Sequence, residues 1–392
     1  MYRSSRFGEL LKGLPRAEFN RLVAARESDK HCKGFDSWSH LLSMLYAQLS
    51  GAKSLREVET GFNVQVNHHY HLGASPLKRS TLSDANGQRG CELFEDLCTS
   101  LLNSTHRHIR KQVRKHLYLI DSSPIPLKGL GYEWAKGRGN YRVEGLSVHM
   151  MISPDDELPI KTKITDPNVT DINAGKELVE PEEGATYIFD RGYCDYSWWH
   201  EIHSKGAYFV TRLKKNAAVE VVKQRVIKEQ DRGIILEDAV IQFKHEQTSG
   251  SRAKNPYYGK TLRRIVVHRS DKKTPLILVT NDRKRHASQI ANFYRQRWQI
   301  ELFFKWLKQN LKIKQFLGRS ENAVKIQIYC AIIAFLLVSN YRQSQGLKIT
   351  LKMVLRLFKT DMFSRPDTEK TAYQKHKEEK HKFEQVQGKL AF

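Results

Sequence analysis

The chain has 392 residues, 40% of them hydrophobic and 28% charged, which excludes a fibrous or wholly disordered protein and leaves room for several domains. Its charge is unusual, because 66 Lys and Arg against 42 Asp and Glu leave a formal net charge of +24. A surface this positive repels itself unless it meets a polyanion, and nucleic acid is the commonest one. The charge therefore indicates a nucleic-acid partner, the alternative being a basic protein without an anionic partner.

The sequence also favours a cytoplasmic protein with no membrane contact. The first residues, MYRSSRFGELLKGL, contain no long apolar stretch, so no secretory signal is predicted. The longest apolar run, about 326–338, is interrupted by Gln327 and is too short to span a bilayer, so it predicts a buried helix. Five scattered cysteines form no C-x-x-C pair, which favours reduced thiols over a disulfide frame or a Cys-rich zinc site.

Residues 1–112 are predicted to form an all-helical N-terminal domain that binds DNA, because apolar residues recur there at helical spacing. SLREVETGF and STLSDANGQR are two short helix candidates, with Ser54 and Ser80 in the positions of N-caps. Two short helices joined by a turn suggest a helix-turn-helix, although the same pattern occurs in helical domains that do not bind DNA.

Residues 113–213 change to a pattern of alternating strands and helices. Helices are predicted at DINAGKELVE and YSWWHEIHSKG, where Trp198 and Trp199 are expected to pack in the core. Apolar runs predict strands at RKHLYLID, GLSVHMMIS, LPIKTKIT, ATYIFD and AYFVTRL. Because these runs are apolar throughout, we expect an α/β fold whose strands are covered by helices on both faces.

The rest of the chain is predicted to hold three further segments. Residues 214–275 form a β-rich insertion, whose loop RAKNPYYGKTLRR mixes basic and aromatic residues as DNA-backbone surfaces do, or is simply solvated. Residues 276–342 return to the core with an apolar strand and a long amphipathic helix at about 286–313. Residues 343–392 are Lys-rich and predict a solvated helix or a frayed tail.

Asp121 and Asp190 have the same local setting, because each follows a run of apolar residues. An aspartate at the end of a buried strand is unfavourable unless it is paired, hydrogen-bonded or bound to metal. Two such strands side by side would bring the carboxylates together, and a divalent cation would neutralise their repulsion. An oxygen-only acidic site suits Mg²⁺ or Mn²⁺, whereas either aspartate alone is also explained as a turn or cap residue.

A third acid lies on the long predicted helix. At about 100° per residue, Tyr294, Arg297, Glu301, Lys305 and Lys308 share one face. The opposite face is apolar and comprises Ile300, Leu302, Phe303, Trp306 and Leu307. A single acid among several cations and an aromatic hydroxyl suits one metal ligand surrounded by phosphate-binding groups, although an exposed basic helix face would also explain the pattern.

The spacing Tyr294-x₂-Arg297-x₃-Glu301-x₆-Lys308 resembles the signature helix of the DDE transposases of bacterial insertion sequences, in the Tyr-Arg-Glu-Lys subgroup of the fourth insertion-sequence family. LYLIDSSPI and YIFDRGYCDY resemble the first and second aspartate motifs of that family. The resemblance runs from about residue 54 to 341, and its first part is similar to the helical domain that precedes the catalytic core in one branch.

The resemblance implies a ribonuclease-H-like core with an inserted β subdomain, and an endonuclease that performs cut-and-paste DNA transposition. It implies that Asp121, Asp190 and Glu301 are the catalytic triad and hold two Mg²⁺ ions, with Mn²⁺ as a substitute. Contacts to DNA phosphates are expected from Tyr294, Arg297 and Lys308, with Lys305 beside them. The expected partners are the terminal inverted repeats of a transposable element, target DNA and a second copy of the chain in a synaptic complex, in the bacterial nucleoid.

One departure and several alternatives accompany this interpretation. Some relatives place a base-stacking tryptophan in the β insertion, but residues 200–297 contain none, so the sequence leaves open whether a hairpin intermediate is used. The rival functions are a DNA-binding relic, another ribonuclease-H-like nuclease or resolvase, and a ribosomal or RNA-chaperone role. The cluster His68, His69 and His71 lacks Cys or carboxylate partners at metal spacing and is interpreted as a polar turn rather than a zinc site.

Overall fold

A computed structural model describes residues 4–112, 116–137, 144–214, 216–247, 254–270, 274–313 and 315–366. The chain divides into two compact units, the first comprising residues 1–101 and 307–392 and the second residues 102–306. The N-terminal helices thus share a unit with the C-terminal residues, instead of forming a separate domain over 1–112. The Lys-rich stretch 368–389, predicted as a solvated helix or frayed tail, lies outside the described residues.

The first unit is helical over its described residues. Its helices are α1 (Arg6–Leu11), α2 (Arg16–Ala25), α3 (Ser37–Ser50), α4 (Leu55–Asn63), α5 (Val66–Leu72), α6 (Arg79–Gln88), α12 (Glu321–Ser344) and α13 (Leu351–Asp361). Two more helices cross the unit boundaries, α7 (Glu92–Gln112) and α11 (Trp298–Asn310).

The predicted buried helix at 326–338 is confirmed, because α12 is buried along most of its length. By length and composition α12 could also cross a membrane, but 83% of its most apolar window is buried inside the protein.

Two expectations for this unit need correction. Ser54 does cap α4, since its hydroxyl accepts a hydrogen bond from the Glu57 amide at 3.2 Å. Ser80, however, lies inside α6, which begins at Arg79 after the extended residue Lys78. Helix α5 lies between α4 and α6, so the two predicted helices are not joined by a simple turn.

The predicted C-terminal tail also contains an ordered helix. Helix α13 buries Val354, Leu355 and Phe358 along one face, at the i, i+1 and i+4 positions of an amphipathic helix. Thr350 is the N-cap of this helix, because its hydroxyl accepts a hydrogen bond from the Met353 amide at 3.3 Å. The composition of residues 343–392 concealed this helix, since its apolar stripe is short and its other face is basic.

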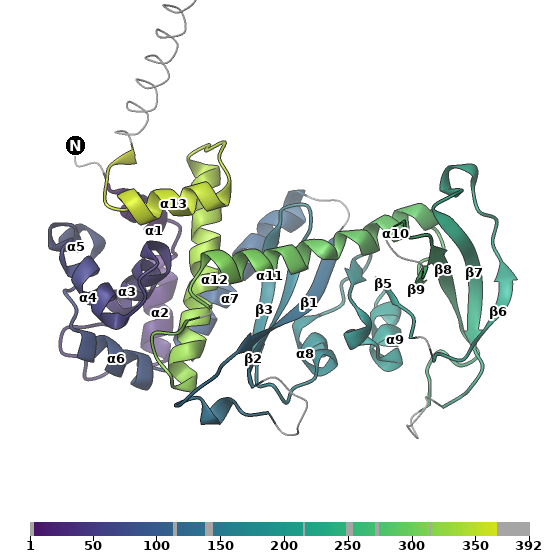
Figure 1. Ribbon diagram of the computed structural model, residues 1–392, viewed down its shortest axis with the longest axis horizontal. Coiled ribbons are helices and arrows are strands. Elements are labelled where there is room, and N and C mark those ends of the chain that lie inside the picture. The colour runs from purple at the N-terminus through teal and green to yellow at the C-terminus, as the bar shows by residue number, and fades with distance from the viewer. Residues whose placement is uncertain are drawn as a thin grey trace, which may run out of the picture. The chain divides into compact units, whose positions relative to one another are not determined.

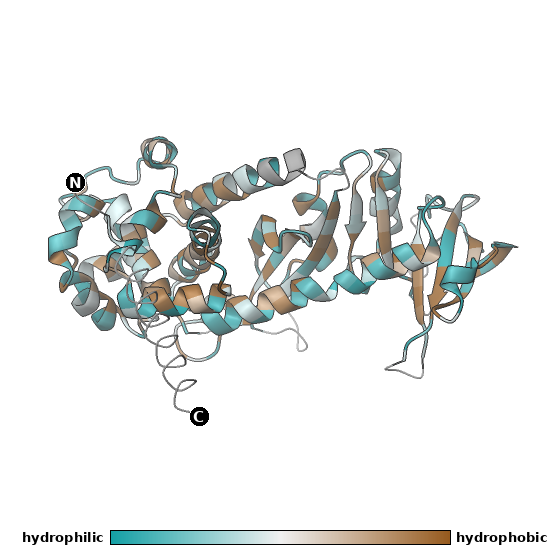
Figure 2. Cartoon of the chain, turned by 90° about the horizontal axis from the view of Figure 1, so that it is seen from above, coloured by the Kyte–Doolittle hydropathy of each residue, from teal (hydrophilic) through white to brown (hydrophobic). Residues whose placement is uncertain are grey.

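The second unit is built on one mixed sheet with the strand order β3-β2-β1-β4-β5-β9-β8-β7-β6 (Figure 1). The strands are β1 (Leu117–Pro126), β2 (Gly145–Ser153), β3 (Leu158–Thr165), β4 (Thr186–Ile188), β5 (Tyr208–Arg212), β6 (Val219–Gln224), β7 (Ile235–Phe243), β8 (Thr261–Val267) and β9 (Leu276–Thr280). The strands in the middle of the sheet are largely hydrophobic (Figure 2), as the continuous apolar runs predicted.

The pairing within this sheet defines the core. Strands β1, β2 and β3 pair antiparallel, whereas β1, β4 and β5 pair parallel. This order and these directions are those of a ribonuclease-H-like sheet. The strands of the predicted β-rich insertion, β6, β7 and β8, continue the same sheet, because β9 pairs antiparallel with both β5 and β8.

Helices cover both faces of this sheet. On one face, α8 (Asp171–Leu178) and α9 (Tyr196–Ser204) contribute Leu178, Trp198 and Trp199 to a core that also contains Tyr118 and Ile120 of β1. The predicted burial of both tryptophans is confirmed. On the other face lie α10 (Ala287–Gln296) and α11 (Figure 1). Short 3-10 turns are η1 (Glu133–Ala135), η2 (Arg191–Tyr193) and η3 (Glu229–Asp231).

The long helix predicted at 286–313 is interrupted at Arg297. The Arg297 amide bonds to Tyr294 O, and the Ile300 amide to Arg297 O, so the chain makes three-residue steps there. This change of pitch shifts the faces that an ideal helical period assigns. Tyr294, predicted on the polar face, is 7% exposed, and Leu302, predicted on the apolar face, is 47% exposed.

Candidate active site

Asp121 lies inside β1 rather than at its end, because the strand continues to Pro126 by pairing with β2. Its Oδ1 accepts a hydrogen bond from the Ser122 amide at 2.9 Å. Alternation along β1 directs Tyr118 and Ile120 into the core beneath α8 and α9, so Asp121 faces the opposite side of the sheet. There its carboxylate meets the guanidinium of Arg297.

Asp190 follows β4 and begins the turn η2, where its Oδ1 accepts from the Gly192 amide at 2.7 Å. Strands β1 and β4 are parallel neighbours, with Leu119 opposite Ile188. Asp121 lies two residues beyond Leu119 in β1, and Asp190 lies two residues beyond Ile188, just past the end of β4. The predicted proximity of the two strands is confirmed by this register.

Arg297 joins the first aspartate to the acid on the helix. Its Nη1 donates to Asp121 Oδ2 at 2.9 Å, and its Nη2 donates to Glu301 Oε1 at 2.5 Å. The three side chains are only 16–34% exposed, so the guanidinium is held between two part-buried carboxylates. Glu301 and Asp121 therefore bind the same guanidinium.

The electrostatics of this cluster are those of crowded acids. The pKa of Asp121 is raised to about 6, mainly by burial and to a smaller extent by the charges of Asp190 and Glu301. The Ser122 amide and Arg297 act in the opposite direction, since both stabilise the ionised carboxylate. A divalent cation would favour the ionised forms of all three acids, and their oxygen-only donor set fits Mg²⁺ or Mn²⁺. Among the described residues, no three acidic, His or Cys side chains already surround one point at coordinating distance.

The predicted phosphate-contacting residues are only partly brought together. Tyr294 lies beside Arg297, with the guanidinium carbon 5.8 Å from the centre of its ring. Burial raises the pKa of Tyr294, and the charge of Asp190 adds to this effect. Lys305 is exposed one turn after Glu301. Lys308 lies further along α11, in the segment assigned to the other compact unit.

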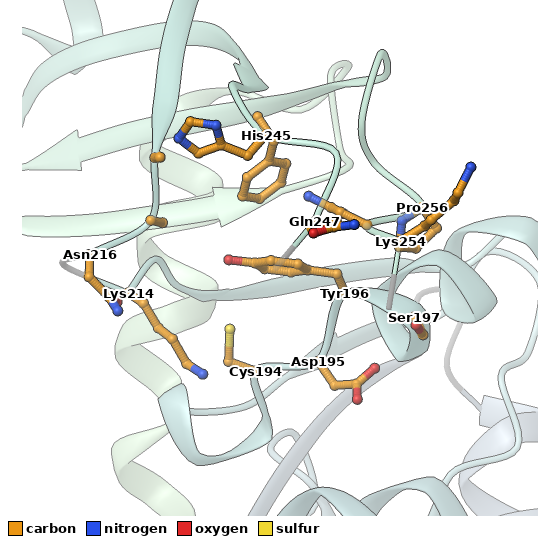
Figure 3. A pocket seen from close by; sticks show the side chains of 14 residues that line it. Cys194, Asp195, Tyr196, Ser197, Lys214, Asn216, His245, Gln247, Lys254 and Pro256 are labelled. Atoms are coloured by element: carbon orange, nitrogen blue, oxygen red, sulfur yellow. The ribbon is translucent and has the colours of Figure 1, made fainter. Parts of the chain in front are cut away.

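A cavity of about 380 Å³ opens beyond η2, between the start of α9 and the strands of the insertion (Figure 3). Tyr196 and Phe243 contribute aromatic surface, with ring centres 4.6 Å apart. Lys214 and Lys254 lie on opposite sides of it (Figure 3). Residues 254–256, which belong to the loop predicted to contact DNA, form part of the cavity wall. The contact between this loop and DNA stays a prediction.

Two other interpretations can be compared with the structure. In the loop predicted to face DNA, Tyr257 turns inward instead, because it is fully buried and its hydroxyl donates to Trp199 O at 3.1 Å. In the histidine cluster, His69 is buried and bonds to Phe62 O at 2.9 Å, and His68 packs near Phe363. Within the described part of the chain no metal-holding group includes these histidines.

A fourth acid near the cluster was not singled out from the sequence. Asp171 is the first residue of α8, and its Oδ1 accepts a hydrogen bond from the Ser122 hydroxyl at 2.8 Å. The only signal in the sequence is an aspartate at a predicted helix start, where acids are common for reasons of helix stability alone. Its proximity to the aspartates depends on how α8 packs on the sheet, which no local pattern encodes.

The comparisons with known proteins agree with this fold. The profile of the Transposase DDE domain family matches residues 113–337, and a domain of unknown function (DUF4372) matches residues 3–75. A Sinorhizobium fredii protein bearing the name transposase y4zB is 44% identical over 268 residues, covering 67% of this chain and 72% of that protein. A Geobacillus stearothermophilus protein named as a transposase for insertion sequence element IS5377 is 25% identical over 261 residues, covering 66% of each.

Among solved structures, a piggyBac transposase synaptic complex with hairpin DNA aligns with a TM-score of 0.42 and 14% identity, covering 91% of this chain and 78% of that chain. The family profile and the curated relatives, by contrast, leave no ambiguity. The chain belongs to the DDE transposase family. It is an enzyme of DNA transposition that cleaves DNA and transfers strands, and its family uses divalent metal ions.

Proposed function

We propose that the second unit cuts DNA at transposon ends and joins it to target DNA with Asp121, Asp190 and Glu301 as the metal-binding triad. The observation that supports this most is the bridging guanidinium of Arg297, which bonds to Asp121 at 2.9 Å and to Glu301 at 2.5 Å. Because one guanidinium bonds to both carboxylates, Asp121 on β1 and Glu301 on α11 lie close enough to bind the same positively charged group. Asp190 joins them through the parallel register of β1 and β4.

In the proposed mechanism, Asp121 would be shared by the two metal ions, while Asp190 and Glu301 would each hold one of them. Bound there, divalent ions would supply activation of a water or a 3′-hydroxyl and stabilisation of the leaving oxygen. Arg297 then turns to the phosphate of the cut strand, because its guanidinium matches phosphate geometry as well as carboxylate geometry. Tyr294 lies beside Arg297 in the structure and is proposed to contact the same phosphate.

The proposed DNA substrates are the terminal inverted repeats of an insertion sequence and a target duplex. We propose that two copies of the chain act together on two ends, in the cytoplasm of a bacterium and on its nucleoid. A formal net charge of +24 supports binding of long stretches of DNA backbone. The helical N-terminal residues are proposed to contribute to end recognition.

The direct test is cleavage of a labelled DNA duplex that carries an end of the element and its flanking sequence. Purified full-length chain should produce end cleavage and strand-transfer products with Mg²⁺ or Mn²⁺, and neither after EDTA treatment. A DNA-binding relic would bind without cutting, and a different nuclease of this fold would cut without strand transfer. Metal-independent cleavage would contradict the proposed chemistry.

The proposed phosphate contact of Lys305 has a separate signature. Lys305→Ala should weaken binding to end DNA and flatten the dependence of log K on log salt by about one unit, because one phosphate contact is lost. Filter binding or fluorescence anisotropy over a salt series measures this slope. Lys205→Ala is the matched control, since Lys205 is also exposed but caps α9 on the opposite face of the sheet. Equal slopes for wild type and Lys305→Ala would exclude the contact.

A further inference from the structure

Behind the triad, on the α8 side of the sheet, lies a chain of polar contacts. The Ser122 hydroxyl donates to Asp171 Oδ1 at 2.8 Å, and the Ser122 amide donates to Asp121 Oδ1 at 2.9 Å. Ser122 is thus bonded to both acids at once, one on each side of the sheet. His149, opposite Ser122 on β2, bonds through Nε2 to the Thr165 hydroxyl at 2.9 Å and is fully buried.

Asp171 also approaches the loop of the second aspartate. A β-carbon added at Gly192 would lie 2.9 Å from Asp190 Oδ1 and 3.1 Å from Asp171 Oδ2. The carboxylates of Asp190 and Asp171 therefore both lie against Gly192, and a side chain at this position would crowd both of them. One turn along α8, a β-carbon at Gly175 would lie 2.8 Å from the ring of Tyr193. Two glycines thus permit α8 to pack directly on the turn that follows Asp190.

Two buried polar atoms lie beside these contacts, one on Tyr193 and one on His149. Among the described residues, neither the Tyr193 hydroxyl nor His149 Nδ1 has a hydrogen-bond partner of ordinary geometry. His149 Nδ1 lies 3.8 Å from Asp171 Oδ1. Burial raises the pKa of Tyr193 well above its ordinary value, and the charges of Asp171 and Asp121 add to it, so the hydroxyl keeps its proton.

We infer that Asp171 is a positioning residue of the active site, which fixes Asp121 through Ser122 and Asp190 through the turn at Gly192. This inference rests on the proposed metal-binding role of the two aspartates. Hydrogen-bonded partners of metal ligands set the orientation of those ligands, and their loss commonly weakens metal binding about 10–100-fold. Asp171 differs from an ordinary acid at a helix start, because its carboxylate is bonded across to β1 instead of only favouring the helix dipole.

The test measures Mn²⁺ binding to the full chain without DNA, from the loss of the free-ion EPR signal. Asp171→Ala should weaken Mn²⁺ binding about 10–100-fold. Ser122→Ala should weaken it in the same direction, because it removes the hydroxyl that bonds Asp171 while it keeps both the start of α8 and the backbone amide that bonds Asp121. Asp171→Asn, which keeps an acceptor for the Ser122 hydroxyl, should bind Mn²⁺ more tightly than Asp171→Ala.

A double variant separates positioning from helix stability. Asn173 is exposed in the first turn of α8, so Asp171→Ala/Asn173→Asp restores an acid at the helix start without restoring the contact to Ser122. We expect the thermal unfolding midpoint to recover in this variant while Mn²⁺ binding stays weak. Recovery of Mn²⁺ binding would overturn the inference, because the role of Asp171 would then be helix stabilisation.

The remaining outcomes separate this inference from the proposed function. If Asp190→Asn loses Mn²⁺ binding but Asp171→Ala and Ser122→Ala bind like wild type, the triad stands and the positioning role is wrong. If wild type binds no Mn²⁺, or Asp190→Asn binds it normally, the metal-binding triad itself fails and the inference fails with it. Equal losses in Asp171→Asn and Asp171→Ala would also overturn a positioning role, since the charge rather than the hydrogen bond would then matter.

Discussion

Asp190→Asn should abolish cleavage of transposon-end DNA and leave binding to that DNA intact. The asparagine Oδ1 can still accept the Gly192 amide that Asp190 accepts at 2.7 Å, so the turn after β4 keeps its structure. What is lost is the negative charge that holds a cation. Metal ions supply several kcal/mol of transition-state stabilisation, and each 1.36 kcal/mol is a factor of ten, so we expect a loss of about a thousandfold or more. Asp121→Asn and Glu301→Gln should behave alike.

The control for this experiment is in the same loop. Asp195 is another carboxylate close in sequence, but its Oδ1 accepts the Trp198 amide at 2.8 Å and caps α9. Asp195→Asn preserves a cap and removes a charge outside the triad, so its cleavage rate should stay near that of wild type. Gel assays of single-turnover cleavage and anisotropy measurements of binding, made on the same preparations, give both readouts. Cleavage by Asp190→Asn at the rate of Asp195→Asn would remove Asp190 from the triad.

Much of this arrangement could be predicted from the sequence, because strands buried on both faces leave continuous apolar runs. The runs before Asp121 and Asp190 belong to neighbouring parallel strands, and the helical period placed Arg297 and Glu301 on one face. The structure brings these two helical residues together at 2.5 Å. Local pattern was sufficient there because Arg297 and Glu301 are only four residues apart, and the short steps at Arg297 leave this i, i+4 contact in place.

Other features could not be predicted, because they depend on packing between elements. β1 runs past Asp121 because its later residues pair with β2, which an apolar run ending in aspartate does not reveal. Tyr294 is buried and Leu302 exposed because the helix changes pitch at Arg297. Asp171 approaches Asp190 because Gly175 and Gly192 allow α8 to pack closely, and a sequence shows glycines without showing what they face.

The same limit applies to the insertion, whose sequence predicts strands but not the buried ion pair that holds them. Arg263 on β8 is 2% exposed, and its Nε and Nη2 each donate to Asp238 on β7 at 2.8 Å. Its Nη1 donates to the carbonyls of Asp282 and Arg285, in the segment between β9 and α10. One guanidinium therefore connects the hairpin of the insertion to the start of the helix that leads to Arg297.

Asp238→Ala should accordingly lower the free energy of unfolding by about 3–5 kcal/mol, because it leaves the Arg263 guanidinium buried without its counter-charge. Urea denaturation followed by circular dichroism measures this loss. The neighbouring pair supplies the control, since Glu237 bonds to Arg264 at 2.7 Å but both side chains are 20–27% exposed. Glu237→Ala should cost less than about 1 kcal/mol, as part-exposed ion pairs do.

A double variant shows whether buried charge is the cause. In Asp238→Leu/Arg263→Met both charges are replaced by apolar side chains, so most of the lost stability should return, although the carbonyls of Asp282 and Arg285 lose their donor. Asp238→Ala should also weaken end cleavage more than end binding, because the segment anchored by Arg263 leads into the helix that carries Tyr294 and precedes Arg297. A loss no larger in Asp238→Ala than in Glu237→Ala would show that the pair is solvated and does not anchor the insertion.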